Sequence, residues 1–204
     1  MKICVIGAGK MGLPVACHFA SRGASVVACD LRADLVASVN RGDCPVDEPG
    51  LAELLSAAVR EGRLRASLDA PAAARVSDAI VILVPAILTP EREADLAALQ
   101  SVARSIAPVL AGGKLVSFET TVPVGTTRKL LLPLLESAGA RHGRDFLLAF
   151  SPERIKSGTA LENLGNTPKI VGGVDPESAG RAEAFYREAL GAPVLNLGSC
   201  EAAE

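Results

Sequence analysis

Short runs of β-branched and other apolar residues recur along the chain, and each run predicts a strand. These runs occupy residues 3–6, 25–29, 79–84, 114–118, 146–149 and 169–171, and a weaker run occupies 193–195. Several of them are apolar on both faces, which is typical of strands that helices cover from both sides. The pattern therefore indicates a sheet whose strands are mostly parallel.

Stretches with helical spacing of apolar positions alternate with these runs, at residues 13–22, 51–61, 94–107 and 126–138. A further helix should begin after Asp175 and extend to about Leu190, because Asp175 can cap it and the following Pro-Glu pair suits its first turn. Pro133 lies inside the 126–138 stretch, where it predicts a kink or a later helix start. The alternation predicts an α/β fold of the doubly wound Rossmann type, with helices on both faces of the sheet.

The composition narrows the class of protein. Hydrophobic residues make up 49% of the chain and aromatic residues only 3%, which suits a core of aliphatic side chains. The formal net charge is -2 and no block of Lys and Arg is present, so nucleic acid is not an expected partner. No apolar run reaches the roughly 18 residues that a membrane span needs, and because Met1-Lys2-Ile3 leads directly into the first predicted strand we expect no signal peptide. We therefore expect a cytoplasmic protein with no membrane association and no metal site, whose five cysteines are reduced and mostly structural.

A glycine-rich loop at residues 7–12 follows the first predicted strand directly and opens the first predicted helix. In this context Gly7 permits a tight turn, Gly9 lets the backbone approach a pyrophosphate, and Gly12 lets the helix lie close to the strand. The free amides and the positive end of the helix dipole favour the phosphates. We therefore expect a dinucleotide to bind to Gly7, Gly9, Lys10, Met11 and Gly12.

An acidic residue ends the second predicted strand, at Asp30. Its carboxylate can accept hydrogen bonds from the adenosine ribose and would repel a 2′-phosphate, which favours NAD over NADP. Arg32 leaves the choice open to some degree, because a guanidinium there can bind that phosphate or stack on adenine. NAD is the cofactor we expect, with Asp30 and Arg32 in its site.

Further along the chain, six motifs follow one another in order. They are Gly7-Ala8-Gly9-Lys10-Met11-Gly12-Leu13-Pro14, Asn40-Arg41-Gly42 with Glu48-Pro49-Gly50-Leu51, Gly62-Arg63-Leu64-Arg65-Ala66, Glu119-Thr120-Thr121-Val122-Pro123-Val124-Gly125-Thr126-Thr127, Ser151-Pro152-Glu153-Arg154-Ile155, and Pro168-Lys169-Ile170-Val171-Gly172-Gly173. This series resembles the NAD-binding domain of the UDP-glucose/GDP-mannose dehydrogenases, which oxidise the C6 alcohol of a nucleotide sugar to a carboxylate. The resemblance implies an NAD-dependent oxidoreductase of polysaccharide biosynthesis that takes a UDP-sugar, UDP-N-acetylmannosamine included. It also implies a full-length protein that is a homo-oligomer.

The resemblance assigns roles to residues at the carboxyl ends of the strands. Thr121 would lie beside the nicotinamide and help to position a water. Glu153 would be a base or a water-activating residue, with a pKa that burial raises toward the working pH, and Glu153, Arg154 and Ile155 would contact the sugar nucleotide. The simpler alternatives are that Thr126 or Thr127 caps the next helix while Thr121 is only part of a turn, and that Glu153 and Arg154 form an exposed ion pair.

The sequence also departs from the family pattern. Lys10 stands where many members have an aromatic residue. Ala86 stands where many have a Thr, so that Val84, Pro85 and Ala86 can flank the nicotinamide ribose only through their backbone. His18 and His142 have no plausible catalytic partners in the sequence, and we expect packing or solvent roles for both.

We expect residues 1–204 to form one NAD-binding domain, with a dinucleotide-binding core at 1–118 and added strands and helices at 119–204. None of the five cysteines has the glycine-rich surroundings of the family's catalytic Cys, so the chain is expected to be a fragment that binds NAD without turnover. It would lack the central helix and the C-terminal substrate domain. Two alternatives stay open: another two-domain NAD(P)-dependent dehydrogenase of the 6-phosphogluconate or hydroxyacid type, and a non-catalytic dinucleotide-sensing module.

Overall fold

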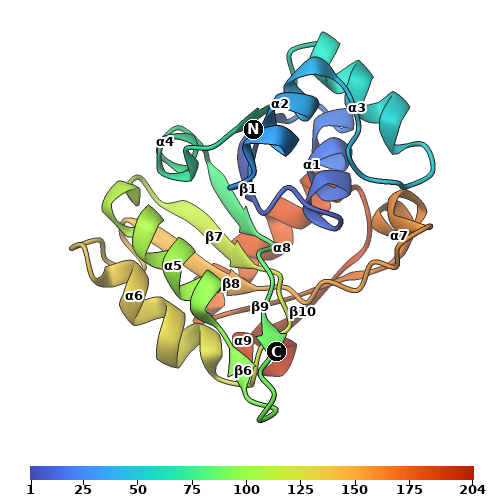
Figure 1. Ribbon diagram of the computed structural model, residues 1–204. Coiled ribbons are helices and arrows are strands. Elements are labelled where there is room, and N and C mark those ends of the chain that lie inside the picture. Colours follow the sequence, from blue (N-terminus) through green and yellow to red (C-terminus); the bar gives the residue numbers. More distant parts are fainter.

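One sheet of eight strands organises the computed structural model, which describes residues 1–204 (Figure 1). In chain order its strands are β1 (Lys2–Ile6), β2 (Ser25–Cys29), β3 (Leu64–Ser67), β4 (Ala79–Ile82), β7 (Lys114–Phe118), β8 (Phe146–Phe150), β9 (Lys169–Gly173) and β10 (Val194–Ser199). Across the sheet the order is β10-β9-β8-β7-β4-β1-β2-β3, and all neighbours are parallel except β8 and β9. The expected mostly parallel, doubly wound α/β sheet is confirmed.

The strand order reverses direction beside β1. From β1 the chain moves outward through β2 and β3 and then returns to place β4 on the other side of β1. The loops that leave β1 and β4 therefore diverge, and a crevice opens between them at the carboxyl ends of the strands.

Helices cover both faces of the sheet, as expected. One layer holds α1 (Gly12–Ser21), α2 (Ala33–Arg41), α3 (Leu51–Arg60), α7 (Ala160–Asn166) and α8 (Pro176–Leu190), and the other holds α4 (Ala70–Arg75), α5 (Ala97–Ile106), α6 (Leu132–Glu136) and α9 (Cys200–Ala203) (Figure 1). Successive residues of β1 alternate between the layers: Ile3 and Val5 pack in the first core cluster, Cys4 and Ile6 in the second. This alternation explains why the strand is apolar at every position.

All seven predicted strands are present, with ends that differ by a few residues. The sequence analysis missed β3 and the helices α2, α4 and α7. Strand β3 is short and alternates buried Leu64 with exposed Arg65 at the sheet edge, so it carries no apolar run. For α4 a signal was available, because Asp69 caps the helix by accepting from the Ala72 amide and a Pro follows in the first turn.

The predicted helix 94–107 is wrong at its start. Ala94–Asp95 form strand β6, which pairs antiparallel with β5 (Ile87–Leu88) in a separate two-stranded hairpin. Helix α5 begins only at Ala97, whose amide donates to the Asp95 carboxylate at 2.9 Å. The later helix start expected from Pro133 is confirmed: a π-helical turn spans Thr127–Leu131, and α6 follows with the Pro in its first turn, where no backbone donor is needed.

Both histidines tie helices to their neighbours. The Nε2 atom of His18, on α1, lies 2.9 Å from the Leu190 carbonyl oxygen at the end of α8. The Nε2 atom of His142 lies 3.0 Å from the hydroxyl of Ser178, which is fully buried. These contacts give both side chains packing roles. None of the helices has the length and apolar character that crossing a membrane demands.

The cap of α8 generates a stability prediction. Asp175 accepts from the Ser178 amide at 2.7 Å, so Asp175→Ala should lower the free energy of unfolding by about 1 kcal/mol, measured by urea denaturation. Asp43, which is exposed and paired with Arg41, supplies the control Asp43→Ala, expected to change it by less than about 0.5 kcal/mol. Equal losses in the two variants would contradict the capping role.

Candidate functional site

The carboxyl ends of β1, β4, β7 and β8 meet at one edge of the sheet and surround a cavity of about 600 Å³. Three segments of the first half of the chain line it, at residues 7–12, 30 with 32, and 83–86, and two segments of the second half complete it. The lining residues are Gly7, Gly9, Lys10, Met11, Gly12, Asp30, Arg32, Leu83, Val84, Pro85, Ala86, Glu119, Thr120, Thr121 and Glu153. The cavity thus gathers all the residues singled out from the sequence for the cofactor and for catalysis, whereas Arg154 and Ile155 line a smaller adjoining pocket.

The three glycines of the loop serve different purposes. Gly7 has a positive φ of 98°, and a Cβ there would lie 2.8 Å from the Leu83 carbonyl oxygen; a Cβ on Gly12 would lie 1.8 Å from the Gly7 carbonyl oxygen. Protein packing therefore demands glycine at both positions. A Cβ on Gly9, in contrast, would meet nothing nearer than the Arg32 guanidinium at 3.7 Å. The glycine at position 9 leaves open space over the loop, at the place where a pyrophosphate approaches the backbone in dinucleotide-binding folds.

The first turn of α1 suits an anion. No side chain caps this helix and no acidic residue lies in its first turn, so its positive end faces the cavity without a competing carboxylate. The loop itself is held from below, because the amides of Gly7 and Ala8 both donate to the Cys29 carbonyl oxygen. These residues fit the phosphates of NAD.

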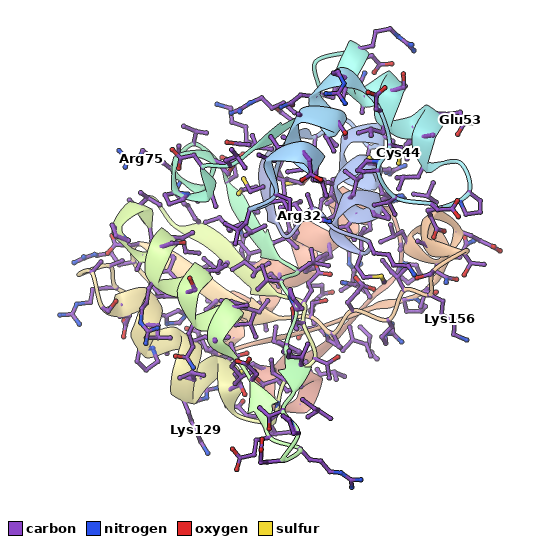
Figure 2. The ribbon with its side chains drawn as sticks, viewed as in Figure 1. Arg32, Cys44, Glu53, Arg75, Lys129 and Lys156 are labelled. Carbon is purple, nitrogen blue, oxygen red and sulfur yellow. The ribbon has the colours of Figure 1, made fainter.

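Asp30 and Arg32 form an ion pair on the cavity wall, with Arg32 Nε 3.2 Å from Asp30 Oδ1 (Arg32 is labelled in Figure 2). The Arg32 amide donates to the same oxygen at 3.1 Å. The Asp30 side chain is 13% exposed, and both contacts of Arg32 engage the same oxygen, Oδ1. The Arg32 guanidinium is thus paired with the Asp30 carboxylate, the group that favours NAD over NADP.

A second, mainly apolar cavity of about 500 Å³ adjoins Asp30 and Arg32. Side chains from the segment after β3 and from α5 form its far wall, among them Leu68, Pro71 and Val102. Its shape and apolar lining suit an adenine ring. The sequence analysis missed these residues, because they come from separate elements and carry no motif.

The Thr-rich turn after β7 is anchored at Thr120, whose hydroxyl donates to the Val84 carbonyl oxygen at 2.5 Å. Thr121 is exposed and lines the cavity. The alternative that Thr126 or Thr127 caps the next helix is wrong, because neither side chain accepts from a helix amide. The Glu204 carboxylate binds here instead: one of its oxygens accepts from the Gly125 amide and the other from the Thr127 amide.

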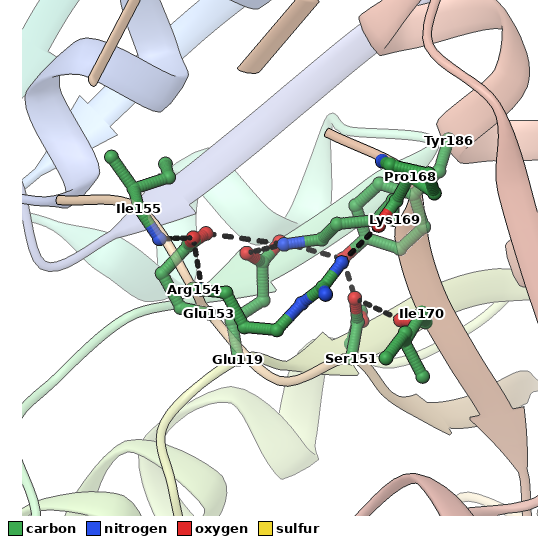
Figure 3. A network of polar contacts seen from close by, with 10 residues as sticks. Glu119, Ser151, Glu153, Arg154, Ile155, Pro168, Lys169, Ile170 and Tyr186 are labelled. Atoms are coloured by element: carbon green, nitrogen blue, oxygen red, sulfur yellow. Dashed lines mark hydrogen bonds and ion pairs between the residues drawn. The ribbon is translucent and has the colours of Figure 1, made fainter. Parts of the chain in front are cut away.

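Glu153 faces the cavity from the loop after β8, and its carboxylate is held on three sides (Figure 3). The amides of Arg154 and Ile155 donate to Oε1 at 2.6 and 2.7 Å, and the Lys169 ammonium donates to Oε2 at 3.1 Å. Lys169 also donates to Glu119 Oε2 at 2.6 Å. Glu119 and Lys169 are almost fully buried, and the sequence analysis gave neither of them a role.

The alternative of a Glu153–Arg154 ion pair is wrong, and so is the raised pKa expected for Glu153. Its carboxylate pairs with Lys169 and not with the Arg154 guanidinium, which donates to the Pro168 carbonyl oxygen. Its pKa is not raised: burial favours the neutral form, but Lys169, Glu119 and the Ile155 amide outweigh burial and lower the pKa of Glu153. Glu119 takes the raised pKa instead. Complete burial is the main cause, opposed by the Lys169 charge and assisted by Glu153, and the pKa of Glu119 rises from 4.5 to about 7.

The loop that carries Glu153 is tied down at its far end by Glu48. This carboxylate is buried and accepts from the amides of Gly158 and Ala160 at 2.6 Å each, just before and inside α7. Its motif was visible in the sequence, but its partners lie 110 residues and more away. Glu48 therefore fixes the segment between Glu153 and α7 against the first half of the chain.

All five cysteines are free thiols, four of them buried, and none lines the cavity beside Glu153. No group of three or more His, Cys, Asp or Glu side chains is placed to hold a metal ion.

Comparison with known proteins shows which family the chain belongs to. Residues 1–190 match the family model described as the NAD-binding domain of the UDP-glucose/GDP-mannose dehydrogenase family. The chain belongs to this family. Among curated relatives, the UDP-N-acetyl-D-mannosamine dehydrogenase of Yersinia pestis is 38% identical over 192 residues, which cover 91% of this chain and 45% of that protein. The chain thus spans about half the length of the curated relatives that it matches.

Solved structures of the family share the fold. The UDP-D-ManNAc dehydrogenase of Pyrococcus horikoshii superposes with a TM-score of 0.92 at 34% identity, over all of this chain and 48% of that one. The GDP-mannose dehydrogenase of Pseudomonas aeruginosa gives 0.93 at 29% identity, over all of this chain and 47% of that one. A 3-hydroxyisobutyrate dehydrogenase of Salmonella typhimurium, with a TM-score of 0.68 at 18% identity, shares the fold alone. The family model names NAD as the cofactor, in agreement with the glycine loop and Asp30.

The raised pKa of Glu119 predicts a pH-dependent stability. Between pH 4.5 and about 7 the folded chain keeps a proton on Glu119 that the unfolded chain releases, so the free energy of unfolding should fall as the pH rises through this window. At about 1.4 kcal/mol per pKa unit the fall amounts to about 3 kcal/mol. Glu119→Gln should abolish it, as measured by urea denaturation at a series of pH values.

The control for that experiment is Glu53→Gln, at an exposed position of α3 (labelled in Figure 2). It should keep the wild-type slope. Carboxyl groups with a lowered pKa, such as Glu153, change the free energy of unfolding only at pH values below the window from pH 4.5 to about 7. An unchanged slope in Glu119→Gln would show that Glu119 is ionised throughout.

Proposed function

We propose that this chain binds NAD and forms the cofactor half of a nucleotide-sugar 6-dehydrogenase that oxidises a UDP-sugar to the uronate. The observation that carries the proposal is the single cavity in which the glycine loop of the first βαβ unit and the Glu119, Thr121 and Glu153 side chains of later loops meet. In an open α/β sheet, ligands bind at this edge. The printed names of the most similar relatives support a substrate of the UDP-N-acetylmannosamine type.

Within this proposal the chain's own residues bind and orient. The loop at residues 7–12 holds the pyrophosphate of NAD, Asp30 the adenosine ribose, and the backbone of Val84, Pro85 and Ala86 the nicotinamide ribose. Bound NAD supplies the hydride acceptor. Thr121 positions a water beside it, Glu153 accepts a proton as its ionised carboxylate, and Arg154 and Ile155 contact the sugar nucleotide.

The proposal extends to the full protein as a homo-oligomer that acts in the cytoplasm in polysaccharide biosynthesis. The five free thiols support a reducing compartment. The names of the relatives support the nucleotide-sugar pathway class.

Gly9 provides a test of NAD binding that separates ligand contact from folding. A methyl group fits there without a clash in the protein, so Gly9→Ala should keep wild-type stability but weaken NAD binding by about tenfold or more, measured by titration calorimetry. Gly180→Ala, on the exposed face of α8, is the matched control and should bind NAD normally.

The same titration with NADP tests the role of Asp30. Weaker binding of NADP than of NAD is expected, because the carboxylate repels a 2′-phosphate. Equal NAD affinity in Gly9→Ala and wild type would contradict the placement of the pyrophosphate, and tighter binding of NADP would contradict the cofactor.

The catalytic proposal is tested on the full-length protein that contains this sequence, by NADH formation with UDP-N-acetylmannosamine, UDP-glucose and GDP-mannose. Glu153→Gln and Thr121→Val should each lower kcat by about 100-fold with little change in NAD affinity, because each removes a polar group at the reacting end of the cavity. Glu188→Gln, exposed on α8, is the control. A full-length protein that binds NAD but oxidises none of these sugars would favour a dinucleotide-sensing module.

A further inference from the structure

Two carboxylates share one ammonium group beneath the cavity (Figure 3). Lys169 Nζ, on β9, lies 2.6 Å from Glu119 Oε2 and 3.1 Å from Glu153 Oε2. The two carboxylates come from different loops, after β7 and β8, and only the antiparallel strand β9 brings a cation between them. The arrangement leaves one more negative group than positive in a buried place.

The surroundings decide which carboxyl group keeps a proton. Glu119 is 1% exposed, and its other oxygen accepts from the Tyr186 hydroxyl at 2.6 Å. That hydroxyl in turn lies 2.8 Å from the hydroxyl of Ser117, and both residues are fully buried. Glu153 instead lies at the cavity wall, 13% exposed, with two backbone amides on one oxygen. Burial therefore places the proton on Glu119, and amides together with the ammonium keep the charge on Glu153.

No other cation competes for these two carboxylates. The Arg154 guanidinium binds the Pro168 carbonyl oxygen, and Lys10 and Arg32 line the opposite wall of the cavity, where Arg32 pairs with Asp30. On the α8 side, Tyr186 is the titratable group that faces Glu119, and the Lys169 ammonium also lies 5.3 Å from the centre of its ring.

We propose that Lys169 and Glu119 are positioning residues for Glu153: Lys169 fixes its carboxylate, ionised, toward the cavity, and Glu119 is the buried acid that shares the Lys169 ammonium with it. The inference rests on the proposed role of Glu153 and adds the groups that set its charge. The lowered pKa of Glu153 and the pKa of about 7 for Glu119 agree with this division.

The test is a ¹³C NMR titration of the glutamate side-chain carboxyl groups of this chain, with signals assigned from Glu119→Gln and Glu153→Gln. In the wild type, the Glu119 carboxyl should titrate near pH 7 and the Glu153 carboxyl below its ordinary pKa. In Lys169→Met the Glu153 carboxyl should titrate higher by about one pH unit or more, because the ammonium that favours its ionised form is gone. Lys169→Arg should restore most of the wild-type midpoint, and Glu119→Gln should lose only the titration near pH 7.

The matched control is Lys114→Met, which removes a strand lysine that binds the carbonyl oxygens of Arg75 and Ser77, at the other end of β7. It should leave both midpoints unchanged. If Lys169→Met folds and its Glu153 midpoint stays where the wild type has it, or if the titration near pH 7 persists in Glu119→Gln, the inference is overturned.

Two further measurements separate this inference from the proposed function. NAD binding by calorimetry should be within about threefold of wild type in Lys169→Met, because the glycine loop and Asp30 are untouched. In the full-length protein, the acid limb of the kcat profile should move up by about one pH unit in Lys169→Met and return in Lys169→Arg. Loss of NAD binding in the wild type would overturn the proposed function while the NMR result still decides the inference.

Discussion

Burial of the sheet on both faces is the constraint on which the rest of this structure depends. Because Ile3 and Val5 pack into one helical layer while Cys4 and Ile6 pack into the other, neither face of β1 can hold a polar group. The polar groups of the candidate site therefore gather in the loops at the strand ends and at the first residue of β9, Lys169. The parallel arrangement sends the carboxyl ends of β1, β4, β7 and β8 to one edge, so segments more than a hundred residues apart in the sequence line a single cavity.

What the sequence predicts well is local. Helix α8 is predicted at both ends, because its cap, its first-turn Pro and its terminal Gly lie in the sequence itself. The glycine loop is equally local, and the structure adds a distinction that the motif does not contain. A side chain at Gly7 or Gly12 would clash with atoms of the protein, whereas a side chain at Gly9 would not. Of the three glycines, only Gly9 therefore points to a ligand.

What the sequence misses is non-local. Glu119 and Lys169 are 50 residues apart, and they meet because β9 runs antiparallel to β8, a reversal that no run of apolar residues reveals. For the same reason the raised pKa expected for Glu153 is wrong. Its neighbours in space are an ammonium and a second, more deeply buried carboxyl group, and neither is close to it in the sequence. Glu119, in the Thr-rich motif, has the raised pKa expected of Glu153 in the later motif.

The four-electron oxidation of the proposed function would need some groups that line the cavity and one that does not. Proton transfer and cofactor orientation need an ionised carboxylate, a hydroxyl and an anion-binding loop, and Glu153, Thr121 and residues 7–12 place all three at one edge. A thioester route needs a thiolate as well. The thiols of Cys4, Cys17 and Cys200 are buried with a raised pKa, chiefly through a hydrogen bond to the Cys29 thiol for Cys4 and burial for the other two, and none of the five cysteines reaches the cavity. These buried cysteines do not supply the thiol that the thioester route of the proposed function would need, whereas Lys169 already keeps the Glu153 carboxylate in its ionised form at the cavity wall.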